Sequence, residues 1–295
     1  MTTATNLYRL QTQFTDETFS ASHSDIYNLY LTIGKSTVRF GLEDVTRHKM
    51  LAFEEYTLTN VFTPLQLAQQ LRELASEHAF LNQTNWHQVR VSVKNQKFTL
   101  LPYTLYDPAA AAEYLRLHAE LDEYHDRVLT YHHAGIDAVN IFATDQHVLS
   151  FLADTFPAEK TQVRHHTSAL IETLLHATER TVQKKIYAYA EQNYLTIILI
   201  TDGALEFCNV FYYATPEDFM YFLIFVMQEQ KLNPDQDPLT IWGDISHDSA
   251  LFDLMRKYIR HVRLGKKPTG LAYSYKFEEH FEHRYLDVFS LHFCE

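Results

Sequence analysis

Alternating apolar and polar positions predict most of the β-strands of this chain. Between residues 27 and 33, Leu29, Leu31 and Ile33 alternate with more polar residues, which is the period-two pattern of a strand with one apolar face. The next three residues, Gly34-Lys35-Ser36, predict a tight turn into a second strand. Alternating or apolar runs predict the remaining strands at 38–42, 50–58, 89–93, 98–101, 138–143, 184–191, 194–201, 204–213, 239–242 and 284–293.

Apolar residues three and four positions apart predict helices between these strands. Thr63 precedes Pro64, the order expected of a helix N-cap and the first helical position, and Leu71 and Leu74 then share one face. Thr215-Pro216 repeats this start before a second helix. Further helices are predicted at 108–131, 146–156, 165–180 and 248–262.

The order of these elements repeats once along the chain. Three strands, a helix that starts at Thr-Pro, another strand and another helix occur in the first part and again from residue 184. This repeat predicts two related α/β lobes, a first lobe at 1–183 with an inserted helical segment and a second lobe at 184–295. The alternative is that such a run is common in mixed α/β folds without any duplication.

Five stretches carry a resemblance to a known family: FTLLP at 98–102, VNIFATD at 139–145, the segments 205–229 and 239–262, and HFCE at 292–295. They resemble the domain-of-unknown-function family 3822 (DUF3822), a family of uncharacterised bacterial proteins assigned to the actin-like ATPase superfamily. The resemblance implies duplicated ribonuclease-H-like lobes, with mixed sheets and flanking helices, around a nucleotide cleft. It implies no activity, because that family has none established.

The turn Gly34-Lys35-Ser36 is similar to the end of a P-loop but does not complete one. A P-loop needs G-x-x-x-x-G-K-[ST] between a strand and a helix, whereas Leu29 stands at the first Gly position and a strand follows the turn. The resemblance implies another role, because in the actin-like superfamily the first hairpin of each lobe holds phosphate and Mg²⁺ through Asp-x-Gly. Here Thr32 stands in place of that Asp, and the matching turn at 191–193 has no Gly.

The candidate cofactor-binding residues are Gly34, Lys35, Ser36 and Gly243. The resemblance implies that Lys35 and Ser36 would contact phosphate. It also implies that Gly243 would accommodate adenosine, because the superfamily places glycines after a strand for that purpose. The alternative for Gly243 is a strand-to-helix turn, with one of the Asp or Ser residues that follow it as the helix cap.

The sequence predicts neither a catalytic nor a metal-binding residue. It contains no G-x-S-x-G motif, Cys208 lies in an apolar strand, and neither of its adjacent histidine pairs has the spacing of a zinc site. The sequence therefore favours a protein that is not an enzyme. A weaker alternative is an enzyme with a carboxylate site at Asp244 and Asp248.

Charge and the lengths of apolar runs limit the possible partners. Lys and Arg number 25 against 37 Asp and Glu, a net charge of −12, which disfavours nucleic acid despite a basic stretch at 256–267. The longest apolar run, Phe219–Met227, has nine residues, whereas a membrane helix needs about 20, so no membrane span is predicted. Two cysteines and no visible signal peptide predict a cytoplasmic location.

The run Phe219–Met227 is also informative because it is apolar nearly all round. A helix of this kind must be covered on all sides, either by the rest of the chain or by a protein partner or a second copy. The expected function is therefore that of a non-catalytic interaction or scaffold protein without a cofactor. The alternative is a nucleotide-binding protein or weak ATPase that holds Mg-ATP at the first-lobe hairpin.

Overall fold

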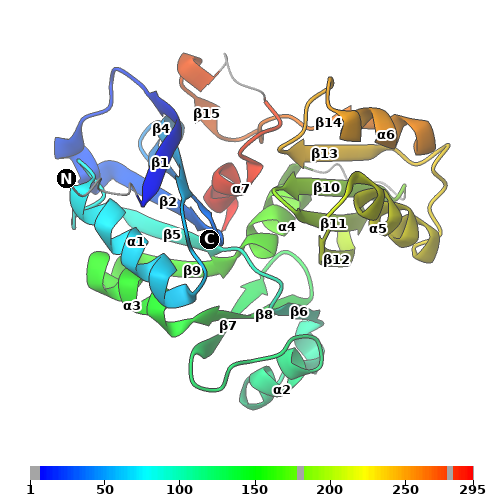
Figure 1. The fold of residues 1–295 in the computed structure, drawn as a ribbon, viewed down its shortest axis with the longest axis horizontal. Coiled ribbons are helices and arrows are strands. Elements are labelled where there is room, and N and C mark those ends of the chain that lie inside the picture. Colours follow the sequence, from blue (N-terminus) through cyan, green and yellow to red (C-terminus); the bar gives the residue numbers. More distant parts are fainter. Residues whose placement is uncertain (1–6, 178–182, 278–281, 295) are drawn as a thin grey trace. The chain divides into compact units, whose positions relative to one another are not determined.

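The computed structural model describes residues 7–177, 183–277 and 282–294, and Figure 1 shows their fold. Contacts between residues divide them into two compact units. Unit 1 contains residues 7–169, 270–277 and 287–294, and unit 2 contains residues 170–177, 183–269 and 282–286. The lobe boundaries expected from the sequence, 1–183 and 184–295, stay a prediction.

Unit 1 is built on a seven-stranded mixed sheet. Its strands are β1 (Tyr8–Thr15), β2 (Tyr27–Ile33), β3 (Thr37–Asp44), β4 (Lys49–Leu58), β5 (Gln88–Val93), β9 (Thr161–His165) and β15 (Ala272–Tyr273). Their order is β1-β4-β3-β2-β5-β9, with β15 beside β4. Strands β2, β5 and β9 are parallel, whereas β2, β3 and β4 form an antiparallel meander. The predicted strands of this region are confirmed, and β1, β9 and β15 are additional to them.

Two helices of unit 1 have the predicted starts. The side chain of Thr63 accepts a hydrogen bond from the Gln66 N–H at the start of α1 (Pro64–Glu77), and the Gln66 side chain bonds back to complete a capping box. Asp145 caps α3 (Gln146–Thr155). The rings of Phe40, on β3, and His78, the C-cap of α1, have centroids 5.0 Å apart. The end of α1 therefore contacts the face of the sheet that carries the apolar residues.

The segment between β5 and β9 forms a small sheet instead of the predicted long helix at 108–131. Its strands have the order β6 (Phe98–Leu101), β8 (Ala138–Asp145) and β7 (Asp126–His133), and helix α2 is confined to Ala111–Arg116. The helix prediction is wrong because β7 pairs along its whole length with β8. Pairing with a neighbouring strand overrides the helical preference of the local sequence.

Unit 2 contains a five-stranded sheet in the order β12-β11-β10-β13-β14. The strands are β10 (Lys185–Glu191), β11 (Tyr194–Thr201), β12 (Ala204–Tyr212), β13 (Leu239–Gly243) and β14 (Val262–Leu264). The predicted strands of this region are confirmed. Asp202 and Gly203 have φ angles of 50° and 76°, as the two central residues of a type I′ turn require.

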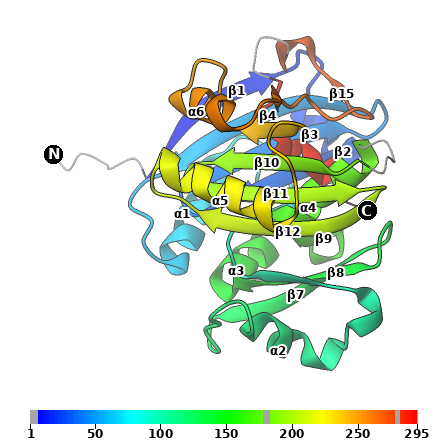
Figure 2. The same cartoon turned by 90° about the vertical axis from the view of Figure 1, so that its right-hand side faces the viewer.

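The helices of unit 2 are α4 (His166–Ala177), whose first residues belong to unit 1, α5 (Pro216–Glu229) and α6 (Ala250–Tyr258). The last residues of the helix predicted at 165–180 lie outside the described residues. Figure 2 shows α5 lying over one face of the sheet. Helix α6 is shorter than the predicted 248–262, because Ser249 is its N-cap and Val262 belongs to β14.

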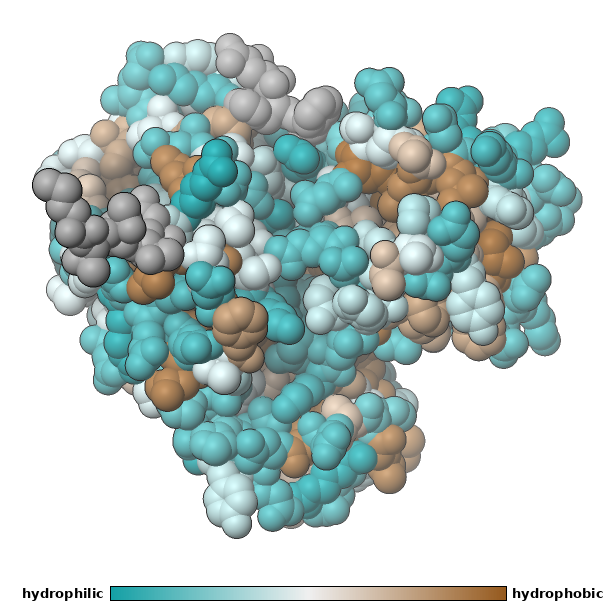
Figure 3. Space-filling model, in the orientation of Figure 1, coloured by the Kyte–Doolittle hydropathy of each residue, from teal (hydrophilic) through white to brown (hydrophobic). Residues whose placement is uncertain are grey.

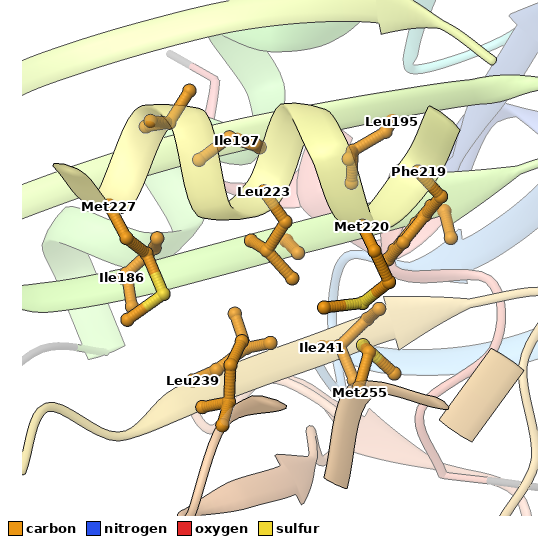
Figure 4. Close-up of a cluster of buried hydrophobic side chains, with 14 of the residues drawn as sticks. Ile186, Leu195, Ile197, Phe219, Met220, Leu223, Met227, Leu239, Ile241 and Met255 are labelled. Carbon is orange, nitrogen blue, oxygen red and sulfur yellow. The ribbon is translucent and has the colours of Figure 1, made fainter. Parts of the chain in front are cut away.

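The core of unit 2 lies between α5, α6 and the sheet (Figure 4). Phe219, Leu223 and Met227 of α5 are fully buried there against residues of β10, β11 and β13. The opposite side of the helix is not covered, since Tyr221 is 64% and Phe225 43% exposed. Within unit 2 the helix is therefore covered on its inner side only, and the choice between cover by the rest of the chain and cover by a partner or second copy stays a prediction.

The last segment is helical, so the predicted strand at 284–293 is wrong. Helix α7 (Leu286–Phe289) is followed by a short 3-10 helix, and Val288 and Leu291 are buried. Apolar residues here recur three apart as well as two apart, so the pattern fits a helix too. The 3-10 helices of the structure are Ala21–Ile26, Tyr103–Leu105, Pro108–Ala110, Ala158–Lys160, Tyr275–Phe277 and Ser290–Phe293. Within the described ranges, no helix is long and apolar enough to cross a membrane.

Candidate functional site

The parallel strands of unit 1 end together at one edge of the sheet. Ile33 of β2 lies beside Val93 of β5, and Val93 lies beside His165 of β9. Ligands of open α/β sheets bind outside the carboxyl ends of parallel strands. The residues that follow these ends, the turn 34–36 after β2 and Lys94 after β5, therefore mark the candidate site.

The predicted phosphate-binding turn is closed by backbone hydrogen bonds. The Gly34 N–H donates to the Thr37 carbonyl over 2.9 Å, and the Ser36 carbonyl accepts from the Leu58 N–H over 2.8 Å. The side chain of Lys35 is exposed. A Cβ placed on Gly34 would lie 3.2 Å from the Thr37 carbonyl oxygen and 3.8 Å from the Lys94 side chain, so Lys94 passes alongside this turn.

A carboxylate from the C-terminal segment occupies the middle of the site. One oxygen of Asp287 lies 2.5 Å from the Lys94 Nζ, 3.1 Å from an Arg39 guanidinium nitrogen and 3.2 Å from the Thr32 hydroxyl. The Asp287 side chain is 0% exposed and that of Arg39 3%. Two cations and a hydroxyl donor thus surround one buried carboxylate beside the turn at 34–36.

Strand register explains why these polar groups meet. Thr32 on β2 lies directly opposite Arg39 on β3, and Arg39 lies opposite Glu55 on β4. Directly opposite residues of neighbouring strands point to the same face of a sheet. Arg39 also forms an ion pair with Glu55 over 2.7 Å, so its guanidinium group lies between two carboxylates.

The rest of the C-terminal segment covers the same polar face of the sheet. The Arg90 guanidinium donates to the carbonyls of Leu291 and His292 over 3.0 and 2.7 Å. His292 also pairs with Glu43 over 3.0 Å. Burial alone would raise the pKa of Glu43, but hydrogen bonds from His292 and Tyr30 hold it below its ordinary value.

Two buried histidines lie next to this ionic cluster. Burial, and then the positive charge of Lys94, lower the pKa of His166 to about 3. Burial also holds the pKa of His165 well below its ordinary value, and its ring bonds the Thr167 hydroxyl and the Asn95 carbonyl. Both imidazoles are therefore neutral near pH 7 and add no charge to the cluster.

Gly243 belongs to unit 2 and has a backbone that suits only glycine. Its φ is +108°, and a Cβ there would lie 1.8 Å from the Ala190 carbonyl oxygen. Its N–H donates to the His283 carbonyl over 2.9 Å. A close approach of β13 to β10 thus accounts for this glycine. Asp244 and Asp248, the weaker carboxylate candidates, are both exposed.

The second hairpin turn, at 191–193, is held by hydrogen bonds within unit 2. The Tyr213 hydroxyl donates to the Gln192 carbonyl over 2.7 Å, and the Asn193 side chain donates to the Tyr213 carbonyl over 3.0 Å. The Asp244 carboxylate lies 3.4 Å from the Gln192 nitrogen. As at the first hairpin, a carboxylate of the chain itself approaches the turn.

These arrangements do not fit Mg-ATP as the actin-like pattern would hold it. A phosphate group at the first hairpin would compete with the buried Asp287 carboxylate for Lys94 and Arg39, the two cations that already pair with it. Among the described residues, no three or more His, Cys, Asp and Glu side chains lie together as a metal ion would need.

The sequence-based prediction of the site did not include Arg39, Lys94 or Asp287. Of these three residues, only Arg39 could have been noticed from the local sequence, because it is a charged residue inside an apolar strand.

Comparisons with known proteins agree with this fold. The model of a family described as protein of unknown function (DUF3822) matches residues 16–262. The crystal structure of a protein with actin-like ATPase fold and unknown function from Bacteroides thetaiotaomicron VPI-5482 is similar, with a TM-score of 0.79 and 19% identity, over 94% of this chain and 99% of that chain. A search of curated protein sequences found no match.

A second similar structure is a chain of the PilM-PilN type IV pilus biogenesis complex. Its TM-score is 0.59 at 13% identity, over 91% of this chain and 98% of that chain. At such identities the likeness shows the fold alone. The fold predicted from the sequence, mixed sheets with flanking helices of the actin-like ATPase kind, is confirmed.

Proposed function

Because the chain belongs to the DUF3822 family of proteins of unknown function and has the actin-like ATPase fold, we propose that it is a non-catalytic interaction protein. It keeps the ATPase fold but binds protein chains through its surfaces, and it uses no cofactor. The proposal includes the cytoplasmic location and the absence of nucleic-acid partners that charge and cysteine content favour.

The observation that carries this proposal is the position of Asp287. Its carboxylate, held by Lys94, Arg39 and Thr32 beside the first hairpin, supplies the negative charge that a phosphate would bring to the same place. An incoming phosphate would have to displace a buried carboxylate that already has two cationic partners. We therefore propose that Asp287 acts as an internal substitute for the phosphate.

The choice of a protein partner is supported by two further observations. A chain of the same fold is part of the PilM-PilN type IV pilus biogenesis complex, so this fold occurs in a protein assembly. The exposed aromatic side of α5 includes Tyr221 and Phe225, and exposed aromatic side chains are enriched where proteins meet. Figure 3 shows hydrophobic residues among polar ones on the face of the protein that is turned to the viewer in Figure 1.

Thermal unfolding with and without Mg-ATP tests the proposal. A ligand at 100 times its dissociation constant stabilises a protein by about 2.7 kcal/mol, whereas we expect no shift at millimolar nucleotide beyond that of Mg²⁺ alone. A shift that disappears in Lys35→Ala would support the alternative, a nucleotide-binding protein or weak ATPase with Gly34, Lys35 and Ser36 on phosphate.

A second arm tests the role given to Asp287. Asp287→Ala leaves Lys94 and Arg39 without this counter-charge, so inorganic phosphate should raise the melting temperature of the variant and leave that of the wild type unchanged. The matched control is Asp154→Ala, which breaks the exposed ion pair with Arg72 and should give no response to phosphate. Equal responses in all three proteins would contradict the proposed substitution.

A further inference from the structure

Strand β12 forms one edge of the sheet in unit 2. It pairs with β11 on one side, and within the described ranges no strand lies on its other side. Backbone groups on an open sheet edge are a template for another strand. Most of the edge is regular, but its register with β11 shifts between Leu199 and Ile200. The shift leaves Glu206 as an extra residue and ends the regular part at Phe207.

The ladder with β11 shows which residues of β12 point outward. The Tyr213 N–H donates to the Asn193 carbonyl over 2.9 Å, so odd-numbered residues exchange hydrogen bonds with β11 and even-numbered residues direct their N–H and C=O groups to the open edge. The side-chain oxygen of Asn209 lies 2.8 Å from the Val210 nitrogen and covers that N–H. The edge is therefore capped by a polar side chain that an incoming strand can replace.

The side chains along this edge are uncharged and largely aromatic. Between Phe207 and Tyr212 there is neither a charged residue nor a proline. Phe211 stacks on Phe222 of α5 with ring centroids 4.8 Å apart. The rings of Tyr221 and Phe225 stack at 6.1 Å and continue the aromatic surface to the exposed side of α5. An occupant of the edge would thus also meet an aromatic wall.

We propose that the occupant is a second copy of the same strand, paired antiparallel about a two-fold axis at Asn209. This proposal rests on the proposed function and names the interface that it uses. In this register Phe207 lies opposite the second copy's Phe211, and Cys208 lies opposite its Val210. The Val210 N–H then donates to the Cys208 carbonyl of the second copy in place of its Asn209 cap.

The sequence favours a copy of itself over an unrelated strand because β12 is symmetric about Asn209. Its neighbours in the sequence, Cys208 and Val210, are both small and apolar, and the residues two positions away, Phe207 and Phe211, are both phenylalanine. Facing aromatic pairs stabilise antiparallel strands. The charge nearest to the axis, on Glu206, lies just beyond the regular part of the strand, at the end of the pairing opposite to that of its own copy, so the pairing places no like charges together.

The oligomeric state of the full chain tests this interface, measured by light scattering over a range of concentrations. We expect a dimer that Val210→Pro converts to a monomer. Proline removes the outward N–H without breaking the ladder to β11, and edge positions of this kind are the ones that accept it. With Trp86 replaced by phenylalanine, the fluorescence of Trp242 in unit 2 reports whether the variant is folded. A wild type that stays monomeric at all concentrations, or a folded variant that stays dimeric, would overturn the proposal.

Cysteine cross-linking gives an independent measurement if Val210→Pro does not fold. On the axis, the two Asn209 positions form a non-hydrogen-bonded pair with Cα atoms about 4.5 Å apart, within the range of a disulfide. Asn209→Cys in a Cys208→Ser background should therefore form a disulfide-linked dimer on mild oxidation. Asn193→Cys, in the exposed turn, is the matched control and should not. Equal cross-linking at the two positions contradicts the register, whereas a response to Mg-ATP would contradict the proposed function and leave the dimer untouched.

Discussion

Replacing Asp287 by asparagine should destabilise unit 1 strongly. The variant keeps the size of the side chain and one acceptor oxygen but removes the charge that faces Lys94 and Arg39. The pair with Lys94 is shielded from water, because the exposed fractions of the two side chains are 0% for Asp287 and 11% for Lys94. Removing one partner of a buried ion pair leaves the other charge uncompensated in a medium of low polarity.

The expected loss follows from this burial. Breaking a buried pair typically lowers the free energy of unfolding by about 3–5 kcal/mol. Arg39 keeps Glu55 as a second partner at 2.7 Å, so the loss should lie near the lower end, at about 3 kcal/mol. The control is Asp154→Asn in the ion pair with Arg72, whose side chains are 65% and 39% exposed. Exposed pairs contribute about 0–1 kcal/mol.

Urea unfolding followed by tryptophan fluorescence measures both changes. The two tryptophans, Trp86 in unit 1 and Trp242 in unit 2, are 1% and 8% exposed. Replacing one of them at a time by phenylalanine makes the signal specific to one unit. Asp287→Asn should lower the midpoint seen by Trp86 while the slope stays unchanged. A loss of unfolding free energy below about 1 kcal/mol, the range of exposed ion pairs, would refute the claim that Asp287 is a buried carboxylate compensated by Lys94 and Arg39.

Four further substitutions test other parts of the structure. Gly243→Ala should destabilise unit 2 by about 2–4 kcal/mol in the same assay, because its φ is +108° and the new Cβ would lie 1.8 Å from the Ala190 carbonyl oxygen. Thr215→Ala should remove the capping box of α5 and cost about 1 kcal/mol, as should Thr63→Ala in α1. Burial and the charge of Lys94 lower the pKa of His166 to about 3 in the folded protein, against about 6.5 when unfolded. The contribution of His166 to the free energy of unfolding should therefore be fully present above pH 6.5. It should fall as the pH drops towards 3, by up to about 1.4 kcal/mol per pH unit. His166→Asn should show a shallower fall when the free energy of unfolding is measured from pH 7 to 4.

The strands of both meanders could be predicted because side-chain alternation is a local property. The Thr-Pro helix starts were predictable for the same reason, since a cap and its helix are adjacent in the sequence. The segment 108–131 was not predictable, because residues 126–133 form β7 only through pairing with β8. The composition of a segment does not show whether a distant strand will pair with it.

The candidate site could be predicted only in part. The turn at 34–36 was identified from its residues, but the carboxylate beside it comes from Asp287, 255 positions after Thr32 and 248 after Arg39. The local pattern around Asp287 fits a strand or a helix equally, so the sequence does not show which face of which element it covers. Contacts at such separations are set by the packing of the whole unit.

The polar face of the sheet in unit 1 and the C-terminal segment depend on each other. Every residue of β2 and β3 is buried, although the alternation in β2 predicted one apolar face. Thr32, Arg39 and Glu43 are buried with polar partners from the C-terminal segment, Asp287 and His292, and such partners matter because unpartnered buried polar groups are costly. On the proposed function, the same contacts that put a carboxylate in place of a phosphate also complete the core of unit 1. The proposal therefore gives the absence of nucleotide binding and the stability of unit 1 without nucleotide the same structural cause.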